Sequence, residues 1–452
     1  MSEASAARLD ALHSWHADWR GLRVVVLGLS VTGFSVADTL AELGASVLVV
    51  SERADEEYAR LLPLIGAQLW TGPLDGPVPA AVVAHEPELV IASPGFAPAH
   101  PLIQWVRAQA IPLWGDIELA WRVRDKVVDA AGDPARWVLI TGTNGKTTTT
   151  QLTAHLLRAG GLRAAPCGNI GVPVLDAVRD PAGFDVLVVE LSSHQLWYLG
   201  LQAGPQPVSP HASVCLNLAD DHLEWHGSFE AYRDAKAHVY DNTRIACVYN
   251  KADIATRTMV EDADVVAGAR AVGFDLGVPG PSDLGVVEGI LVDRAFHDDR
   301  RHSALELATV AELAAAGLGA PHMVANILAA SALARSLGVE PEAIHAALAH
   351  FRLDRHRIEL VATVGGVAWV DDSKATNPHA ADASLASFGD VVWVVGGLLK
   401  GVDISELVAA RASRIRAAIV IGVDRAAVLA AFERHAPGVP VLEVAHDQTG
   451  DV

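Results

Sequence analysis

The stretch WVLITGTNGKTTTT, residues 137–150, decides the fold at the centre of this chain. A short apolar strand, Val138–Ile140, runs into a glycine-bearing loop that ends in GKTT at 145–148, and a helix-like segment follows. Backbone N–H groups of such a loop, together with the N-terminus of the next helix, form a pocket for phosphate oxygens. In this pattern Lys146 reaches the outer phosphates and Thr147 reaches Mg²⁺. The stretch therefore predicts a nucleotide-phosphate loop.

The general phosphate-loop pattern has a glycine where this chain has Ile140. The shorter pattern TGTNGKTTT, residues 141–149, is more discriminating, and it resembles the ATP loop of the Mur ligases and of folylpolyglutamate synthetase. The alternative is a turn between a strand and a helix that binds no ligand. We disfavour it because the order G-K-T directly after an apolar strand is rarely required to form a turn. The resemblance implies that ATP is bound by Gly142, Thr143, Asn144, Gly145, Lys146, Thr147 and Thr148.

The composition indicates a folded protein without nucleic-acid partners. The chain has 452 residues, 51% of them hydrophobic and 19% charged, so two to four domains with buried cores are expected. A net charge of −20 disfavours nucleic acid, because a duplex binder needs a basic face. The three cysteines lack metal-type spacing. Neither a signal peptide nor a membrane-length apolar run is visible, so a cytoplasmic protein without membrane insertion is expected.

Apolar strands alternate with Ala- and Leu-rich helical stretches, which predicts an α/β fold with parallel sheets in three blocks. The segment from about 260 to 310 reads as irregular, and a helix over Asn326–Leu337 is expected to stop at Gly338. Besides the strand of the ATP loop, the predicted strands are Val24–Leu27, Val47–Val50, Leu89–Ala92, Val186–Val189, Val214–Leu216, Val367–Val370, Val391–Val395, Ala418–Ile421 and Val439–Val444.

The first strand is followed by the loop Gly28–Gly33, which mimics a dinucleotide fingerprint with Glu52 downstream. Its middle glycine is replaced by Ser30, and that glycine normally lets the backbone approach a pyrophosphate. A nicotinamide site is therefore disfavoured. A looser nucleotide-diphosphate site and a tight turn without a ligand both remain open for this loop.

Two polar residues follow predicted strands of the second block. Glu190 closes the strand FDVLVVE, at the sheet edge where such folds bind ligands, and is a candidate Mg²⁺ ligand. A solvated strand-end acid is the competing interpretation. His222 lies in a carboxylate-rich turn and pairs at i, i+4 with His226. Zinc is the weaker interpretation of this pair, because no third ligand at metalloenzyme spacing and no H-E-x-x-H accompany it.

Lys236 ends the pattern D-H-x(n)-Y-x-x-A-K, which resembles the Mur ligase segment whose lysine is carbamylated by CO₂. The resemblance implies that the Lys236 carbamate helps to hold a second Mg²⁺ and that Thr147, Glu190 and His222 place the ions. An exposed helical lysine is the alternative. A free lysine is neutral in only about one part in a thousand at pH 7.4, so burial and metal must shift the equilibrium.

The stretch WVDDSKATNP, residues 369–378, is the strongest discriminator. The order D-D-S-K-A-T-N resembles the family members that add D-glutamate, whereas sister ligases show D-Y-[GA]-H or D-G-A-H-N-P patterns there. A polar strand-to-helix turn would explain the polarity of this stretch but not its order. Further resemblances run from about residue 22 to 444, through SPGFAPAHP, GDIEL, GNIG and VVGGLLKGVDIS.

The resemblance also assigns the remaining site residues. It gives ATP contacts to Asn326, Arg357, Asp372 and Lys374; UDP-substrate contacts to Val31, Thr32, Glu52, Arg53, Ser93, Pro94, Gly95, Asn169 and Ser192; and D-glutamate contacts to Thr376 and Lys400. The catalytic set that it implies is Lys146, Lys236, His222 and Glu190.

The resemblance implies three α/β domains. These are a Rossmann-like UDP-substrate domain over 1–114, a central ATPase domain with a mostly parallel sheet over 115–353, and a Rossmann-like amino-acid domain over 354–452. Family members continue past the last strand into a Ser-Pro-Ala-x-A-S segment. Because this chain ends at Val452, an incomplete third domain and a weakened D-glutamate pocket are expected.

The implied reaction is the ATP-dependent joining of UDP-N-acetylmuramoyl-L-alanine and D-glutamate in peptidoglycan precursor synthesis. A monomer with two Mg²⁺ ions is expected. Three alternatives stay open: a family ligase for another amino acid, a NAD-dependent oxidoreductase built on the Gly28 loop, and a nucleotide-binding regulator. The intact set of Lys146, Glu190, His222 and Lys236 disfavours the regulator, and Ser30 disfavours NAD.

Overall fold

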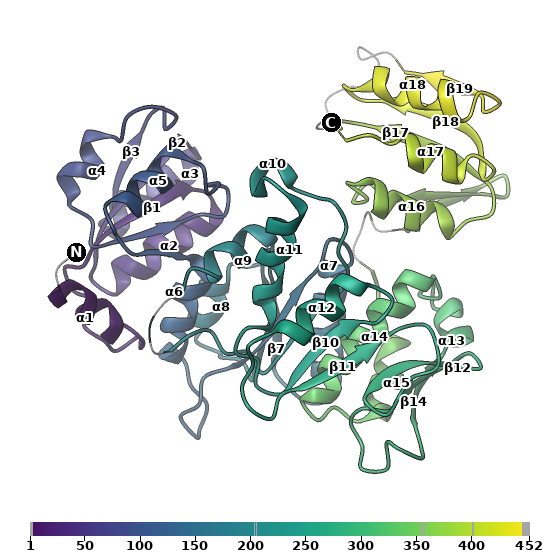
Figure 1. The fold of residues 1–452 in the computed structure, drawn as a ribbon, viewed down its shortest axis with the longest axis horizontal. Helices are drawn as coiled ribbons and strands as arrows, with labels where there is room; N and C mark the ends of the chain where they lie inside the picture. Colours follow the sequence, from purple (N-terminus) through teal and green to yellow (C-terminus); the bar gives the residue numbers. More distant parts are fainter. Residues whose placement is uncertain are drawn as a thin grey trace. The chain divides into compact units, whose positions relative to one another are not determined.

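The computed structural model describes residues 3–202, 204, 206–353, 356, 358–399 and 402–444. The chain divides into two compact units (Figure 1). The first contains Met1–Gly319 and Met323–Phe351, and the second contains Ala320–His322 and Arg352–Val452. Each unit is described by itself below.

The first sheet of the first unit has five parallel strands in the order β3-β2-β1-β4-β5. Its central strand β1 is apolar without alternation, because Val24–Leu27 is buried on both faces of the sheet. The elements are α1 (Glu3–Ala11), β1 (Arg23–Leu29), α2 (Val31–Glu42), β2 (Ser46–Ala54), α3 (Glu56–Leu61), η1 (Leu62–Ile65), β3 (Gln68–Thr71), α4 (Ala80–His85), β4 (Leu89–Ala92), α5 (Pro101–Ala108) and β5 (Leu113–Gly115).

The second sheet has nine strands in the order β14-β13-β12-β11-β10-β9-β6-β8-β7. Strand β6 lies between β8 and β9, so the carboxyl ends of these three strands meet at one edge of the sheet. The strands are β6 (Arg136–Thr141), β7 (Ala164–Gly168), β8 (Val186–Glu190), β9 (Ala212–Cys215), β10 (Ala246–Asn250), β11 (Arg270–Phe274), β12 (Asp283–Val287), β13 (Ile290–Asp293) and β14 (Leu305–Thr309).

Helices surround the second sheet in Figure 1. They are α6 (Asp116–Arg122), η2 (Arg124–Lys126), α7 (Lys146–Ala159), α8 (Val174–Arg179), α9 (Ser193–Leu199), α10 (Leu223–His226), α11 (Phe229–Ala237), η3 (His238–Tyr240), α12 (Ile254–Asp262), α13 (Val310–Ala315), α14 (Pro321–Ser336) and α15 (Pro341–Leu348). The predicted stop at Gly338 fits its left-handed φ of 85°, two residues after α14 ends.

The prediction that residues 260–310 are irregular was wrong. This segment contains four strands, of which β12, β13 and β14 pair antiparallel at the edge of the nine-stranded sheet. Each of these three strands has only four or five residues, and turns rich in Gly, Pro and Asp separate them. Such short runs give little periodicity in the sequence.

The second unit contains a three-stranded parallel sheet, β17-β18-β19, and a separate antiparallel pair, β15-β16. Val408 of α17 and Val428 and Phe432 of α18 are buried with β18 in one apolar cluster. The elements are β15 (Glu359–Val364), β16 (Val367–Asp371), α16 (Pro378–Ala386), β17 (Val391–Gly396), α17 (Ser405–Arg411), β18 (Ile415–Ile421), α18 (Arg425–His435) and β19 (Val441–Glu443). The predicted α/β class with mainly parallel sheets is confirmed.

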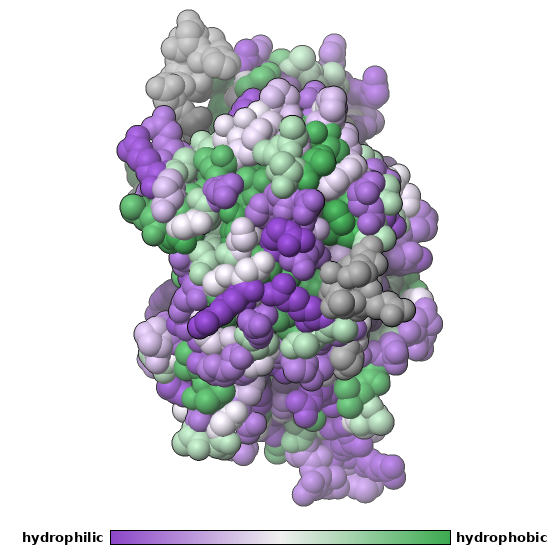
Figure 2. Space-filling model, turned by 90° about the vertical axis from the view of Figure 1, so that its left-hand side faces the viewer, coloured by the Kyte–Doolittle hydropathy of each residue, from purple (hydrophilic) through white to green (hydrophobic). Residues whose placement is uncertain are grey.

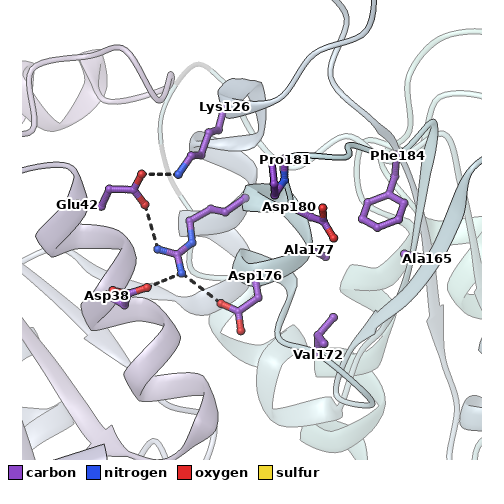
Figure 3. A pocket seen from close by; sticks show the side chains of 11 residues that line it. Asp38, Glu42, Lys126, Ala165, Val172, Asp176, Ala177, Asp180, Pro181 and Phe184 are labelled. Atoms are coloured by element: carbon purple, nitrogen blue, oxygen red, sulfur yellow. Dashed lines mark hydrogen bonds and ion pairs between the residues drawn. The ribbon is translucent and has the colours of Figure 1, made fainter. Parts of the chain in front are cut away.

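An ion-pair network joins the first sheet's helix α2 to α8 of the second sheet. The Arg179 guanidinium contacts Asp38 at 2.5 Å, Glu42 at 3.2 Å and Asp176 at 3.4 Å. Lys126 donates to the second oxygen of Glu42. These groups border a pocket of about 510 Å³ (Figure 3). Because Arg179 is largely buried and has three carboxylate partners, it ties the two α/β layers of this unit together.

Hydrophilic and hydrophobic residues are interspersed on the face of the molecule that Figure 2 shows. Among the described residues, every helix is too short or too polar to cross a bilayer.

Candidate active site

The phosphate loop connects β6 to α7, as the sequence predicts. Gly142 and Gly145 have φ values of 150° and 83°, which residues with a side chain rarely adopt, and Gly145 is the N-cap of the 14-residue α7. Asn217, two residues after β9, forms two hydrogen bonds with the backbone of the loop. Its Oδ1 accepts from Asn144 N at 2.8 Å, and its Nδ2 donates to Asn144 O at 3.0 Å. The loop is therefore fixed by a neighbouring strand.

Lys146 is the first residue of α7 and folds back over its own loop. Its Nζ donates to the carbonyl oxygens of Gly142 at 2.9 Å and Thr143 at 2.8 Å. Thr147 follows on the first turn of the helix and is half-buried. The loop thus combines one cation, one hydroxyl and a helix N-terminus, which is the set that binds a triphosphate with its metal.

Lys236 on α11 is only 2% exposed, so the interpretation as a surface lysine was wrong. Its Nζ donates to Thr141 Oγ1 at 3.1 Å and to Gly142 O at 3.0 Å. Burial, with the charge of Lys146 as the second cause, lowers the pKa of Lys236 to about 7. At that pKa roughly half of the amine is neutral near pH 7, compared with about one part in a thousand for a free lysine.

Glu190 ends β8, next to β6, and is almost fully buried. Its Oε1 accepts from Asn169 Nδ2 at 3.0 Å, while its Oε2 is buried without a hydrogen-bond partner among the described residues. A buried carboxylate oxygen without a donor costs free energy unless something binds it. The chemistry of this oxygen fits a divalent cation.

His222 lies before α10 in the left-handed region, with φ 52°, and its side chain is about half exposed. Its ring packs at 4.8 Å against His194, which in turn stacks on His226. Burial lowers the pKa of His194 to about 3 and that of His226 to about 4, so both are neutral at physiological pH. His226 bonds Ser193 Oγ at 2.9 Å.

His222 and His226 belong to no group of three closely spaced metal-ligating side chains within the described residues. Among the described residues, the one cluster of potential metal-ligating atoms close enough together is His356, Glu359 and Asp371, in the second unit. There His356 Nδ1 already pairs with Asp371 at 2.6 Å.

Asn326 on α14 lies directly against the phosphate loop. A Cβ on Gly145 would be 2.6 Å from Asn326 Oδ1, so this amide occupies the space that a side chain would need. Asn326 is thus placed beside the loop that the sequence assigns to ATP.

The residues predicted to contact the UDP-substrate lie in several segments of the first unit. Val31 and Thr32 begin α2, and Glu52 and Arg53 are exposed near the end of β2. Ser93, Pro94 and Gly95 follow β4, Asn169 follows β7, and Ser192 caps α9 with a capping box. Ser93 Oγ is buried and has no hydrogen-bond partner in the described part of the chain.

Other predicted residues belong to the second unit. Asp372 accepts from Ile358 N at 3.1 Å, and Lys374 and Thr376 are exposed in the turn between β16 and α16. Asn377 caps α16 through Ala380 N. Arg357 and Lys400 lie outside the described residues.

Three supporting residues near the loop received no role in the sequence analysis. Thr141 bonds Lys236, Tyr232 bonds Thr143 at 2.8 Å, and Asn217 clamps Asn144. The i, i+4 spacing of Tyr232 and Lys236 places both on one helix face, and that spacing was a usable signal. The role of Asn217 depends on which strand neighbours β6, which local sequence does not reveal.

Family models match three segments of the chain. The Mur ligase MurD-like N-terminal domain matches residues 22–115, the Mur ligase middle domain matches 140–334, and the Mur ligase glutamate ligase domain matches 356–449.

Two curated relatives are named UDP-N-acetylmuramoylalanine--D-glutamate ligase. The protein of Leifsonia xyli subsp. xyli is 65% identical over 452 residues, covering 99% of this chain and 87% of the relative. That of Streptomyces avermitilis is 50% identical over 437 residues, covering 96% of this chain and 89% of the relative.

The fold also resembles solved structures at low identity. The UDP-N-acetylmuramate-alanine ligase MurC of Thermotoga maritima matches with a TM-score of 0.53 at 19% identity, covering 93% of this chain and 90% of that chain. MurF of Acinetobacter baumannii matches with a TM-score of 0.53 at 17% identity, covering 93% and 81%. These likenesses concern the fold alone.

Proposed function

The chain belongs to the Mur ligase family, and from this we propose that it is an ATP-dependent ligase that joins D-glutamate to UDP-N-acetylmuramoyl-L-alanine. The observation that carries the assignment is the 65% identity, over nearly the whole chain, to a ligase named for that reaction. The Gly28 loop falls within the segment that matches the family's N-terminal domain, so the family assigns it to a ligase rather than to a NAD-dependent oxidoreductase.

In the proposed reaction the carboxylate of the UDP-substrate attacks the γ-phosphorus of ATP. An acyl phosphate forms, and the bond to the bridging oxygen breaks to release ADP. The D-glutamate amine then attacks the acyl carbon, loses a proton, and displaces inorganic phosphate through a tetrahedral intermediate. The protein contributes positioning and charge neutralisation rather than covalent chemistry.

Within this proposal the phosphate loop holds ATP, and Lys146 offsets the charge that develops on the phosphates. Asn326, beside Gly145, contributes to nucleotide binding from α14. Arg357, Asp372 and Lys374 are proposed to contact ATP, and Thr376 and Lys400 to contact D-glutamate. The segments over 1–114, 115–353 and 354–452 are proposed to serve the UDP-substrate, ATP and the amino acid.

Magnesium fits the oxygen donors that Glu190, at the end of β8, and Thr147, on the first turn of α7, offer. Thr147, Glu190 and His222 would hold it, and the unpartnered buried Oε2 of Glu190 supports this assignment. When bound, Mg²⁺ neutralises phosphate charge and orients the phosphoryl group. Two ions are proposed, the second held with help from a carbamate on Lys236.

The carbamate forms when the neutral Lys236 amine attacks CO₂, which makes an N–C bond and releases one proton. The pKa of Lys236, lowered to about 7 by burial, supplies the neutral amine that this step needs. The buried site then exchanges a cation for an anion with two oxygen donors. We further propose that the enzyme acts in the cytoplasm as a monomer on small-molecule substrates, without nucleic-acid or membrane partners.

Phosphate release from ATP tests the assignment. Release should require ATP, Mg²⁺ and UDP-N-acetylmuramoyl-L-alanine together with D-glutamate, and omission of any one should reduce it to background. Equal release without the UDP-substrate would contradict the proposal.

A further inference from the structure

Helix α9, Ser193–Leu199, contacts two segments that the proposed function assigns to the UDP-substrate, one at each of its ends. At its start, Gln195 Oε1 accepts from Ser192 N at 3.1 Å and from Ser192 Oγ at 3.2 Å. The other end of the same amide, Nε2, donates to Asp116 Oδ2 at 3.0 Å. Asp116 therefore fixes the orientation of the Gln195 side-chain amide, which accepts the hydrogen bonds from Ser192.

Near the other end of the helix, Tyr198 Oη donates to the carbonyl oxygen of Phe96 at 2.5 Å. Phe96 N in turn donates to Ser93 O at 3.2 Å, so the hydroxyl of Tyr198 closes the turn that contains Ser93–Gly95. This turn packs on the Gly28 loop: a Cβ on Gly28 would be 3.0 Å from Ser93 Oγ. Tyr198 thus links α9 to two loops of the first sheet.

The packing of α9 leaves little freedom at either contact. Tyr198 is fully buried, and Asp116 and Gln195 are 5% and 4% exposed. A Cβ on Gly115 would be 3.0 Å from Tyr198 Cβ, so the start of α6 approaches α9 as closely as a glycine allows. The Gln195–Asp116 hydrogen bond is buried and the Tyr198–Phe96 hydrogen bond is part-buried, so the loss of one partner leaves the other poorly satisfied.

We propose that Tyr198 and Asp116 are positioning residues for the UDP-substrate. Through α9 they keep the Ser192 turn and the Ser93–Gly95 turn at a fixed spacing, although neither residue touches the substrate itself. The inference rests on the proposed function, because that function assigns both turns to the UDP-substrate.

The test uses two variants of the full chain, Tyr198→Phe and Asp116→Leu. Tyr198→Phe removes the hydrogen bond to Phe96 O in the turn that contains Ser93–Gly95, and Asp116→Leu removes the hydrogen bond to the Gln195 side-chain amide. The KM for UDP-N-acetylmuramoyl-L-alanine should rise about three- to tenfold in each variant, in line with the loss of one hydrogen bond. The KM for ATP and kcat at saturating substrate should stay within about twofold, because the phosphate loop is untouched.

Tyr240→Phe is the matched control. Tyr240 is also fully buried; its hydroxyl donates to the carbonyl oxygen of Val248 at 2.8 Å and accepts from Cys215 N at 3.0 Å, and neither partner belongs to the two turns. This variant should lower Tm at least as much as Tyr198→Phe, because it removes two buried hydrogen bonds, while leaving the KM for the UDP-substrate unchanged. An equal rise in that KM would show general loosening of the fold and would overturn the inference.

The outcome separates this inference from the proposed function. If the wild-type chain releases no phosphate with both substrates, the proposed function itself fails. If it does release phosphate and both variants retain the wild-type KM for the UDP-substrate, the function stands and the positioning role is wrong. Should Asp116→Leu not fold, Tyr198→Phe alone decides the question.

Discussion

Lys146 and Lys236 donate to the same carbonyl oxygen, that of Gly142, from 2.9 and 3.0 Å. Lys146 comes from α7 and Lys236 from α11, so the phosphate loop brings together two ammonium groups from separate helices. Burial and this neighbouring charge both lower the pKa of Lys236. Lys236 is therefore suited to become a neutral nucleophile.

Replacement of Lys236 by alanine should nearly abolish turnover, because the proposed carbamate oxygens are lost. Added acetate or another short carboxylate should partly restore phosphate release by supplying those oxygens. Lys251→Ala is a suitable control, since Lys251 follows strand β10 and is ion-paired with Asp283, and this variant should retain activity. Wild-type turnover of Lys236→Ala in CO₂-depleted buffer would exclude the carbamate.

Replacement of Lys146 by methionine should raise the pKa of Lys236, because a nearby positive charge that disfavours the ammonium form is removed. Burial should still hold that pKa below the value of a free lysine. NMR detection of the ¹³C-carbamate that forms from ¹³CO₂, measured at a series of pH values, reports how much of the Lys236 amine is neutral. Its midpoint should move to higher pH in Lys146→Met; an unchanged midpoint would mean that the two ammonium groups do not interact.

Gly145→Ala should raise the KM for ATP more than tenfold. The new Cβ would be 2.6 Å from Asn326 Oδ1, and the φ of 83° also strains any residue with a side chain. Gly132→Ala is the matched control, because Gly132 has a φ of 87° but open space around its Cβ position. It should lose stability with an unchanged KM for ATP. Equal effects of the two variants on this KM would contradict the role given to the Asn326 contact.

Asp116 should make the stability of the protein depend on pH between about 4 and 6. Burial raises the pKa of Asp116 to about 6, so in this window the folded chain holds a proton that the unfolded chain releases. Its contribution to the free energy of unfolding therefore falls as the pH rises and is constant above the window, a total of roughly 3 kcal/mol. Asp116→Asn should lack this dependence.

Urea unfolding of wild type and Asp116→Asn at pH 4.5 and pH 7 measures the effect. The difference in free energy of unfolding between the two proteins should shift in favour of the variant at the higher pH. A difference that stays constant between the two pH values would show that Asp116 is ionised throughout.

Much of this fold follows from local sequence. Runs such as Leu89–Ala92 are apolar without alternation, which indicates strands buried on both faces, and the observed β4 has those bounds. The antiparallel strands β12, β13 and β14 were missed because each has few residues, so pairing with neighbouring strands matters more than local propensity.

The candidate site also contains residues that local sequence predicts and residues that it does not. Lys146 and Thr147 were predictable because the loop, the cation and the helix start are contiguous in sequence. The burial of Lys236, the clamp of Asn217 on Asn144 and the contact of Asn326 with Gly145 all join distant segments. The strand order around β6 determines the Asn217 contact, and the packing of α11 and α14 determines the other two, so all three depend on the whole domain.

Amino-acid choice tests the central claim most directly. Phosphate release should be measured with ATP, Mg²⁺ and UDP-N-acetylmuramoyl-L-alanine against a panel of D-glutamate, L-glutamate, L-alanine and a diamino acid. We predict release well above background with D-glutamate alone among these. Equal turnover with L-alanine or the diamino acid would contradict the assignment and favour a family ligase for another amino acid.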